Sequence, residues 1–581
     1  MSPLERALHH HAAGRLAEAQ ALYQEILAIH PEHPDALHLL GVVAHQVGRD
    51  ELALPLIQHA LTLRPDHPES HNNLGNVQRR LGHFTDAVAS FTWALALKPH
   101  YPEAHNNLGN VFREMNRLQE AVTCYHRALT LNPNYADAHV NLGMALWRQG
   151  LLAEAVASLQ QGIRLAPNVA GGHLNLGNVL VAAGRLNEAV ASYRQALTLQ
   201  PESAEVHMNL GNALVTLESF DEGLHHLHHG LSLNPASARG HYNLGNGYQK
   251  MGLPERAIPH YRQAIRLQPD FPDARFNEGL SHLLLGALTE GWAGYEWRWQ
   301  SSGFIPHGHT APPWRGESLA GRTLLLHCEQ GFGDSIQFIR FVPRLRMRGG
   351  RVVLWCPPAL KRLFSPIEGI DTLVSTVDDL PPACDCQLPL MSLPHVLGVT
   401  LETLPASIPY LSAEPELLAE KRLPSLPGLK VGVVWRGDPR HGNDRHRSLE
   451  ARALAVLTTV PGCSLIGLQK DVSVTEGAVF AAMGERWLDL SEGLHDFAHT
   501  AAVIAQLDLV IGVDTAVVHL AGALGCPAWL LLPRVPDWRW FLDRDDSPWY
   551  PGMRLFRQRV RGNWDAVLLE VVQALRVVAG S

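Results

Sequence analysis

The first half of the chain repeats one pattern of apolar, small and polar positions every 34 residues. A Leu-Gly pair takes the same place in each period, at 40/41, 74/75, 108/109, 142/143, 176/177, 210/211 and 244/245. Proline ends each period, at 31, 65, 99, 133, 167, 201, 235 and 269. Small residues let two antiparallel helices approach, and proline ends one helix pair before the next begins. The pattern predicts stacked helix pairs over residues 1–288, the last of them degenerate because Glu278 replaces the leucine.

The second half consists of short apolar runs, each followed by a segment with helical periodicity. The predicted strands lie at 324–328, 352–355, 372–374 and 387–391, and then at 431–435, 464–469, 487–490, 509–513, 528–532 and 553–556. Strands that alternate with helices favour parallel sheets, so we expect two Rossmann-like lobes over 323–427 and 428–581, the second closed by a C-terminal helix. Residues 289–322 form an aromatic junction that we expect to be packed against its neighbours.

Composition narrows the class of protein. The 581 residues carry a formal charge of −8, which argues against nucleic-acid binding. The seven cysteines are scattered, so we expect reduced thiols and no metal site. No run reaches the roughly 18 apolar residues that a membrane-spanning helix needs, and the order typical of a signal peptide is missing. A cytoplasmic location is expected.

Residues 511–522 predict a buried strand, a turn and a helix. Asp514 and Thr515 occupy the expected N-cap region, and His519 follows one turn into the helix. The free N–H groups and the dipole of a helix N-terminus favour a bound anion, most often a phosphate. The stretch therefore predicts a phosphate-binding element.

A Gly-rich turn follows the first predicted strand of the α/β half, at Glu329–Ser335. Such turns bring the backbone close to a ligand. The dinucleotide fingerprint fails because Ile336 stands where the third glycine belongs, and the Lys-Ser/Thr of a phosphate-binding P-loop is missing. These departures argue against NAD and ATP and indicate no cofactor.

Two resemblances join these motifs to known families. The 34-residue repeat resembles the tetratricopeptide repeat, which implies an α-helical superhelix. Gly-x-Gly-Asp in the first loop, Val-Trp-Arg-Gly at 434–437 and Gly-Val-Asp-Thr-x-x-x-His at 512–519 resemble the ADP-heptose heptosyltransferases, most of all their tetratricopeptide-fused branch. This second resemblance covers about residues 290–560. It implies a two-lobed GT-B glycosyltransferase fold and a nucleotide-sugar donor as substrate.

The heptosyltransferase resemblance also implies roles for single residues. Asp334 matches the general base, and Asp514, Thr515 and His519 match residues at the donor diphosphate and sugar. Basic residues against the phosphates correspond to Arg436 and to one of Arg445 or Arg447. With Gln469 and Lys470, which end a predicted strand at the expected cleft, the candidate donor-binding residues are Arg436, Arg445, Arg447, Gln469, Lys470, Asp514, Thr515, Ala516 and His519. The sequence departs from that family at Ala516, where glycine is common, and in having Arg where Lys is usual.

The chemistry of an inverting transfer suits these residue types. A carboxylate can take the proton of the acceptor hydroxyl, and arginines with a helix N-terminus can stabilise the departing nucleoside diphosphate without a metal. Asp543-Arg-Asp545 is the one Asp-x-Asp, and its polar surroundings predict a solvated loop. For Asp334 and Asp514 the alternative role is a helix cap, whereas Asp496 is interpreted as a cap, with a ribose contact as the alternative.

Two polar ladders recur on the first helix of the repeats. Asparagine occupies Asn73, Asn107, Asn141, Asn175, Asn209, Asn243 and Asn277, and histidine occupies 71, 105, 139, 173, 207 and 241. The asparagines either bond within the array or clamp an extended peptide, as in the protein O-GlcNAc transferases, whose ladder this one resembles. The histidines are interpreted as packing residues.

Three functions remain open on the sequence. The first is a glycosyltransferase whose repeats recruit a protein or peptide acceptor. The second is a transferase acting on lipopolysaccharide or another surface glycan, with repeats that serve assembly, including a possible homo-oligomer. The third is a non-catalytic repeat scaffold.

Overall fold

A computed structural model describes residues 2–301, 310–376, 378–381, 384–405 and 407–580. The chain forms two compact units, Met1–Pro235 and Ala236–Ser581. Part of the expected junction, residues 302–309, lies outside the described residues. Within the described part, no helix is long and apolar enough to cross a membrane.

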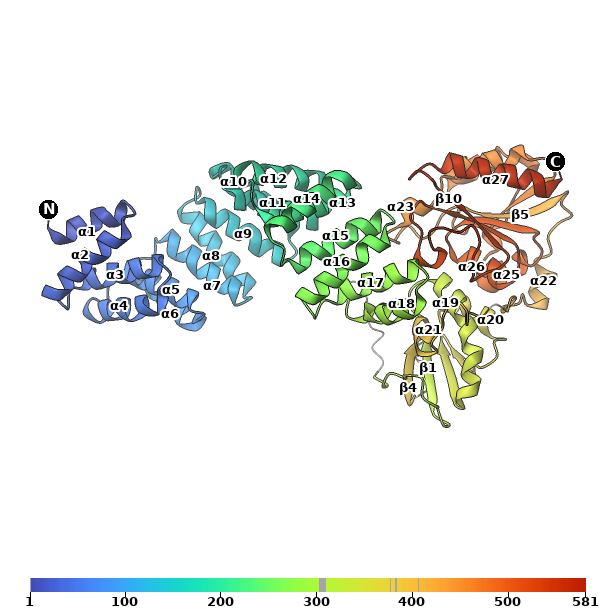
Figure 1. The fold of residues 1–581 in the computed structure, drawn as a ribbon, viewed down its shortest axis with the longest axis horizontal. Helices are drawn as coiled ribbons and strands as arrows, with labels where there is room; N and C mark the ends of the chain where they lie inside the picture. The colour runs from blue at the N-terminus through green and yellow to red at the C-terminus, as the bar shows by residue number, and fades with distance from the viewer. Residues whose placement is uncertain (1, 302–309, 377, 382–383, 406, 581) are drawn as a thin grey trace. The chain divides into compact units, whose positions relative to one another are not determined.

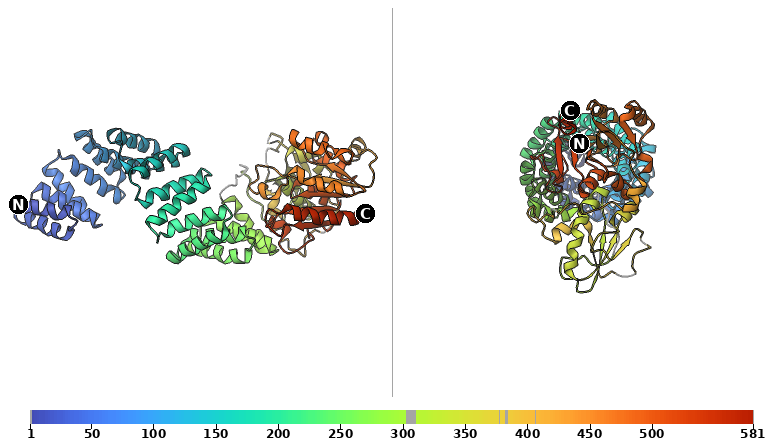
Figure 2. Two further views of the ribbon diagram at one scale, coloured as in Figure 1. Left: turned by 90° about the horizontal axis from the view of Figure 1, so that it is seen from above. Right: turned by 90° about the vertical axis from the view of Figure 1, so that its right-hand side faces the viewer.

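The first unit is built of helices that run antiparallel in pairs (Figure 1; Figure 2, left). Their bounds are α1 (Pro3–Ala12), α2 (Leu16–Ile29), α3 (Pro34–Gln46), α4 (Asp50–Leu63), α5 (Pro68–Arg80), α6 (Phe84–Leu97), α7 (Pro102–Glu114), α8 (Leu118–Leu131), α9 (Ala136–Arg148), α10 (Leu152–Leu165), α11 (Ala170–Ala182), α12 (Leu186–Leu199), α13 (Ala204–Thr216) and α14 (Phe220–Leu233). The glycine of the Leu-Gly pair is the point of closest approach within a pair. A Cβ on Gly109 would lie 2.6 Å from the Tyr125 ring, and one on Gly177 would lie 2.4 Å from the Tyr193 ring. The repeated glycine is therefore a packing requirement.

The histidine ladder closes the turn between successive helix pairs. The Nε2 of His71 bonds the carbonyl oxygen of Pro65 at 2.8 Å, and the Nε2 of His139 bonds that of Pro133 at 2.9 Å. The same bond recurs at 3.1 Å between His173 and Pro167. Each ring donates its N–H to a carbonyl that the end of a helix leaves unpaired. This geometry accounts for the ladder as a packing feature.

The second unit begins with further helix pairs and continues into two parallel sheets. The helical part comprises α15 (Ala238–Lys250), α16 (Pro254–Leu267), α17 (Pro272–Leu284), α18 (Leu288–Tyr295) and the 3-10 turn η1 (Glu296–Trp299). The first sheet has the order β3-β2-β1-β4, with β1 (Thr323–His327), β2 (Arg351–Trp355), β3 (Thr372–Val374) and β4 (Cys386–Pro389). The second has the order β10-β9-β8-β5-β6-β7, with β5 (Leu429–Val434), β6 (Cys463–Gly467), β7 (Trp487–Asp489), β8 (Leu509–Val513), β9 (Ala528–Leu532) and β10 (Met553–Arg557). Every pairing in both sheets is parallel, as the alternation of strands and helices predicts.

Helices and 3-10 turns cover the sheets. In the first lobe they are α19 (Phe332–Phe338), η2 (Ile339–Arg348), α20 (Pro358–Phe364), η3 (Leu390–Ser392), α21 (Leu393–Val396) and α22 (Pro415–Glu420). In the second they are α23 (Asp444–Arg447), η4 (Ala451–Thr459), α24 (Val474–Ala481), η5 (Gly484–Arg486), η6 (Ser491–Gly493), α25 (Phe497–Ile504), α26 (Ala516–Ala523), η7 (Trp538–Trp540) and α27 (Trp564–Ala579). α27 covers one face of the six-stranded sheet, where Val567 and Val571 share a core with Ile511 (Figure 1). The opposite face shares a single core with the first lobe, so the two lobes are packed as one body.

The last helix pair is part of this shared core. Trp292 of α18 is buried, and its ring centroid lies 5.4 Å from that of Trp538 and 6.1 Å from that of Phe338. Its indole Nε1 donates to the carbonyl oxygen of Val399 at 3.0 Å. Aromatic rings from α18, the first lobe and the second lobe therefore meet in one cluster, and the α18 part of the junction is packed.

Candidate functional site

The site is organised by the close approach of two helices that follow sheet strands. α19 begins after β1 in the first lobe, and α26 begins after β8 in the second. A Cβ added at Gly333 would lie 2.9 Å from His519 and 3.4 Å from the Cα of Ala516. Only glycine allows this approach, which brings the two predicted motifs together at the carboxyl ends of their strands.

Asp334 lies at the third position of α19. The N-cap is Gly331, and the Asp334 carboxylate accepts the backbone N–H of that residue at 2.8 Å through Oδ2. The expected alternative, Asp334 as the N-cap itself, is wrong by three positions, because a glycine takes that place and the carboxylate reaches back to it. The other oxygen, Oδ1, pairs with Arg539 of the second lobe. The side chain stays 19% exposed, so solvent or a ligand can reach it.

Arg539 is a site residue that the sequence reasoning missed. Its side chain is only 7% exposed and lies over the Trp538 ring, with the guanidinium 4.2 Å from the ring centroid. Burial alone would lower the pKa of Arg539, but the charges of Asp537 and Asp334 raise it above its ordinary value. An arginine between two tryptophans, in Asp537-Trp-Arg-Trp540, was the available signal, since an arginine in an aromatic core needs a buried acidic partner.

Asp514 faces His519 rather than capping α26. The N-cap is Thr515, and Asp514 Oδ1 lies 3.7 Å from Nε2 of His519. Burial raises the pKa of Asp514, but the facing ring of His519 and the charge of Arg447 outweigh this and hold the pKa below its usual range. The other ring nitrogen of His519, Nδ1, hydrogen-bonds the Tyr550 hydroxyl at 2.9 Å, which fixes the ring.

Two polar atoms beside this pair lack a hydrogen bond of ordinary geometry. The Thr515 hydroxyl, at the N-terminus of α26, is buried and has no hydrogen bond within the described residues. The indole Nε1 of Trp540 is in the same condition, although it lies close enough to Asp514 to help lower the pKa of that carboxyl. A buried polar group without a partner is costly, so such atoms mark a place that a ligand can satisfy.

Arg436 pairs with a carboxylate of its own lobe. Its Nε donates to Glu476 Oε1 at 3.0 Å, and the same oxygen accepts from the indole of Trp435 at 2.8 Å. Gln469 is buried and accepts the backbone N–H of Arg436 at 3.2 Å, whereas Lys470 is exposed. In this arrangement Arg436 and Gln469 are held by contacts within the second lobe, and their role in binding a donor remains a prediction.

The two candidate arginines of α23, Arg445 and Arg447, differ in burial. Arg447 is mostly buried, lies 3.3 Å from Asp444 and acts on Asp514 by its charge. A Cβ on Gly437 would come within 2.5 Å of the Arg447 guanidinium, so the glycine of Val-Trp-Arg-Gly makes room for it. Arg445 is exposed and donates to His446 at 2.9 Å. Of the two, Arg447 is the one whose charge acts on Asp514.

The loop that precedes α19 is held by the end of the last helix pair and by η1. Arg298 of η1 is fully buried and donates to Glu329 Oε1 at 2.7 Å. The amide of Gln330 donates to the Tyr295 hydroxyl, also at 2.7 Å. Burial raises the pKa of Glu329, and the charge of Arg298 offsets only part of that rise. Sequence reasoning missed this ion pair because its partners lie in different predicted domains.

The asparagine ladder bonds between neighbouring repeats. Four of its members donate an amide N–H to an asparagine oxygen of the preceding repeat. These bonds join Asn107 to Asn72 at 3.1 Å, Asn141 to Asn106 at 3.0 Å, Asn209 to Asn178 at 3.0 Å and Asn277 to Asn246 at 2.9 Å. Asn73 donates to the ring of His38 at 2.9 Å, Asn175 is half-buried and Asn243 is buried. Bonding within the array is therefore present, and Asn277 also donates to the Tyr242 hydroxyl at 3.3 Å.

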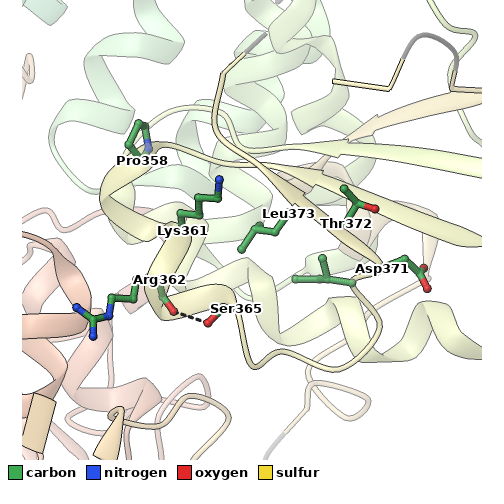
Figure 3. Close-up of a pocket in the computed structure, with 8 residues that line it drawn as sticks. Pro358, Lys361, Arg362, Ser365, Asp371, Thr372 and Leu373 are labelled. Atoms are coloured by element: carbon green, nitrogen blue, oxygen red, sulfur yellow. Dashed lines mark hydrogen bonds between the residues drawn. The ribbon is translucent and has the colours of Figure 1, made fainter. Parts of the chain in front are cut away.

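A separate hollow lies on the first lobe, beside edge strand β3 (Figure 3). Lys361 and Arg362 of α20 line it together with Asp371, and Arg362 pairs with Glu414. None of the site residues that the sequence predicts lines this hollow. Asp543 and Asp545 are both exposed, as expected for a solvated loop.

Comparison with known proteins identifies the repeats. Tetratricopeptide repeat families match residues 32–100, 109–150, 136–169, 177–218 and 238–271. Protein FlbA of Caulobacter vibrioides is 28% identical over 333 residues, 52% of this chain and 54% of its own length, so the chain spans about half of that relative.

Solved structures are similar over part of the chain. The APC/C hetero-tetramer Cut9-Hcn1 is 20% identical, with a TM-score of 0.39 over 46% of this chain and 52% of that one. A thermophilic TPR protein of Thermus thermophilus, TTC0263, is 27% identical, with a TM-score of 0.28 over 31% of this chain and 99% of that one. The family matches and the helix pairs together show that the first half of the chain is an array of tetratricopeptide repeats, joined to an α/β half with two parallel sheets.

Proposed function

We propose that the chain is a glycosyltransferase that moves a sugar from a nucleotide-sugar donor to a polypeptide. One observation carries the proposal. Gly333 lets α19 and α26 meet, so that Asp334 from one lobe and the Asp514–His519 pair from the other lie together at the carboxyl ends of two parallel sheets. Ligands of α/β folds bind at that edge of the sheet.

The second lobe supplies groups suited to the donor diphosphate. The N-terminus of α26 presents backbone N–H groups, and the unpartnered Thr515 hydroxyl stands at that end. Arg447 adds a positive charge on the side of Asp514. A helix N-terminus and an arginine can stabilise the charge that builds on a departing nucleoside diphosphate, so the proposed transfer needs no metal.

The first lobe supplies the base. In an inverting transfer, Asp334 takes the proton of the acceptor hydroxyl while the hydroxyl oxygen bonds the anomeric carbon. The bond from that carbon to the diphosphate oxygen breaks, and the nucleoside diphosphate leaves with its electron pair. The ion pair with Arg539 orients the carboxylate of Asp334 for this step.

The repeat array supports a polypeptide as the acceptor. Tetratricopeptide repeats bind protein partners, and the ladder amides keep donor and acceptor groups that can bond a peptide backbone. The last repeat contacts the loop of Asp334 directly, so a peptide bound along the helices of the second unit would end near the site.

The test is a transfer assay with the full chain, labelled nucleotide sugars and a lysate of the host as the source of acceptors. The proposal expects label in protein, and expects that label to vanish in Asp334→Asn. Label found only in lipid or free glycan would favour the surface-glycan alternative. A chain that binds no nucleoside diphosphate and transfers no label would support the scaffold alternative.

A further inference from the structure

Arg539 joins the two lobes through three different partners. Its Nη2 contacts Asp334 Oδ1, its Nη1 donates to Asp537 Oδ1 at 2.7 Å, and its Nε donates to the Gln337 side chain at 2.7 Å. Asp334 and Gln337 belong to α19 of the first lobe, whereas Asp537 precedes η7 of the second. Each nitrogen of the guanidinium thus has its own acceptor, an arrangement that only an arginine can make.

Burial gives this contact its strength. The Arg539 side chain is almost completely covered, and Asp334 keeps only 19% of its side chain exposed, so water has little access to the contact between them. Ion pairs in such surroundings are screened little, and removing one partner leaves the other charge buried and uncompensated. The position of the Asp334 carboxylate therefore depends on a residue 205 positions further along the chain.

We infer that Arg539 is a positioning residue for Asp334. It holds the carboxylate of the first lobe in a fixed orientation from the side of the second lobe. The inference rests on the proposed function, because it assigns Arg539 a role in the transfer step. The placement of the proposed base then depends on both lobes, because Asp334 is correctly oriented only when the lobes are in contact.

Arg340 provides a matched control. It is buried to the same degree as Arg539, and it also crosses from the first lobe to the second. Its partners are neutral, namely the carbonyl oxygens of Trp549 at 2.7 Å and Gln337 at 3.0 Å and the hydroxyl of Tyr410 at 2.8 Å. Substituting Arg340 disturbs the contact between lobes without touching a site carboxylate.

The first experiment compares wild type, Arg539→Lys and Arg539→Met in steady-state transfer by the full chain. We expect Arg539→Met to lower kcat by about 100-fold, the cost of a catalytic group misplaced by about 1 Å, with little change in KM for the donor. Arg539→Lys keeps the charge but reaches fewer partners, so its kcat should lie between the two. A kcat for Arg539→Met within twofold of wild type would overturn the inference.

The second experiment is chemical rescue. Arg539→Gly leaves a space beside Asp334 that free guanidinium fills, so guanidinium well below denaturing concentrations should restore part of the lost kcat. Arg340→Gly should show no such gain, because its lost contacts do not hold Asp334. Equal rescue of both variants, or rescue of neither, would assign Arg539 to general packing instead.

The remaining outcomes are separable. If Arg539→Met or Arg539→Gly fails to fold, the division of the Arg539→Lys effect between kcat and KM decides the inference alone. A wild-type chain that transfers sugar while the Arg539 variants stay fully active overturns only the inference. A wild-type chain that transfers no sugar from any nucleotide donor overturns the proposed function and, with it, the role of Arg539.

Discussion

The two halves of the chain use polar side chains in opposite ways. In the repeats, neutral amides bond residues about one repeat apart, as Asn107 does with Asn72, 35 positions away. In the α/β half, buried charges join residues that are distant in the sequence, as Arg539 does with Asp334 across 205 positions. The first kind is repeated along the array and weak at each step. The second occurs at single places, where the loss of one partner leaves a charge without compensation.

The largest expected effect concerns Asp334. We expect Asp334→Asn to lower kcat by about 1,000-fold, because a general base contributes roughly 10²- to 10⁴-fold. Binding of the nucleoside diphosphate, followed by the shift of the melting temperature, should persist. Asp496→Asn is the control, since Asp496 caps α25, where it accepts the backbone N–H of His499 at 2.9 Å and contacts the ring of the same residue at 2.6 Å. Equal losses in both variants would remove Asp334 from the chemistry.

The next effect concerns the ion pair between the last helix pair and the site loop. Arg298→Met leaves Glu329 buried without its partner, and we expect a loss of about 3–5 kcal/mol in the free energy of unfolding of the second unit. Urea denaturation monitored by tryptophan fluorescence measures it. The double variant Arg298→Met with Glu329→Gln should regain much of the loss. Equal stability of the single and double variants would contradict a buried charge as the cause.

A smaller effect tests the partner of Arg436. Although burial alone would raise it, hydrogen bonds from Arg436, Ser473 and Trp435 lower the pKa of Glu476 to about 2. A carboxylate with a depressed folded-state pKa contributes stability above its unfolded pKa of roughly 4.5, and that stability is lost as the pH falls toward 2. We expect Glu476→Gln to cost about 2–3 kcal/mol near neutral pH and almost nothing near pH 2. A cost that does not depend on pH in a denaturation series would contradict this assignment.

The smallest effect concerns the ladder. Asn107→Ala removes one neutral bond, and we expect a loss of about 1 kcal/mol in the free energy of unfolding. Because distant sites act independently, Asn107→Ala and Asn209→Ala should add. If the ladder also holds the acceptor, the double variant should raise KM for a polypeptide and leave hydrolysis of the donor unchanged. An unchanged KM would limit the asparagines to bonding within the array.

The same contrast explains what the sequence could predict. Helix pairs and parallel strands follow from local periodicity, so the elements were predictable to within a few residues. Asp334 and Asp514 follow glycines just after strands, and His519 lies one turn into the next helix, a local signal that was also readable. The pairing of Asp334 with Arg539 was not, because it depends on how two separate sheets pack. Glu476 was missed for the same reason, because its ion pair with Arg436 is a tertiary contact.

Tyr295 and Arg298 hold the loop that precedes α19, and these contacts have a consequence for protein engineering. A chimera that replaces the repeats to change acceptor choice must keep α15–α18, since α17 packs against η7 and η1 holds the loop. The suitable seam for such a graft lies between Pro235 and Ala236, where one compact unit ends and the next begins. A graft made at residue 288 would cut through the support of the α/β half.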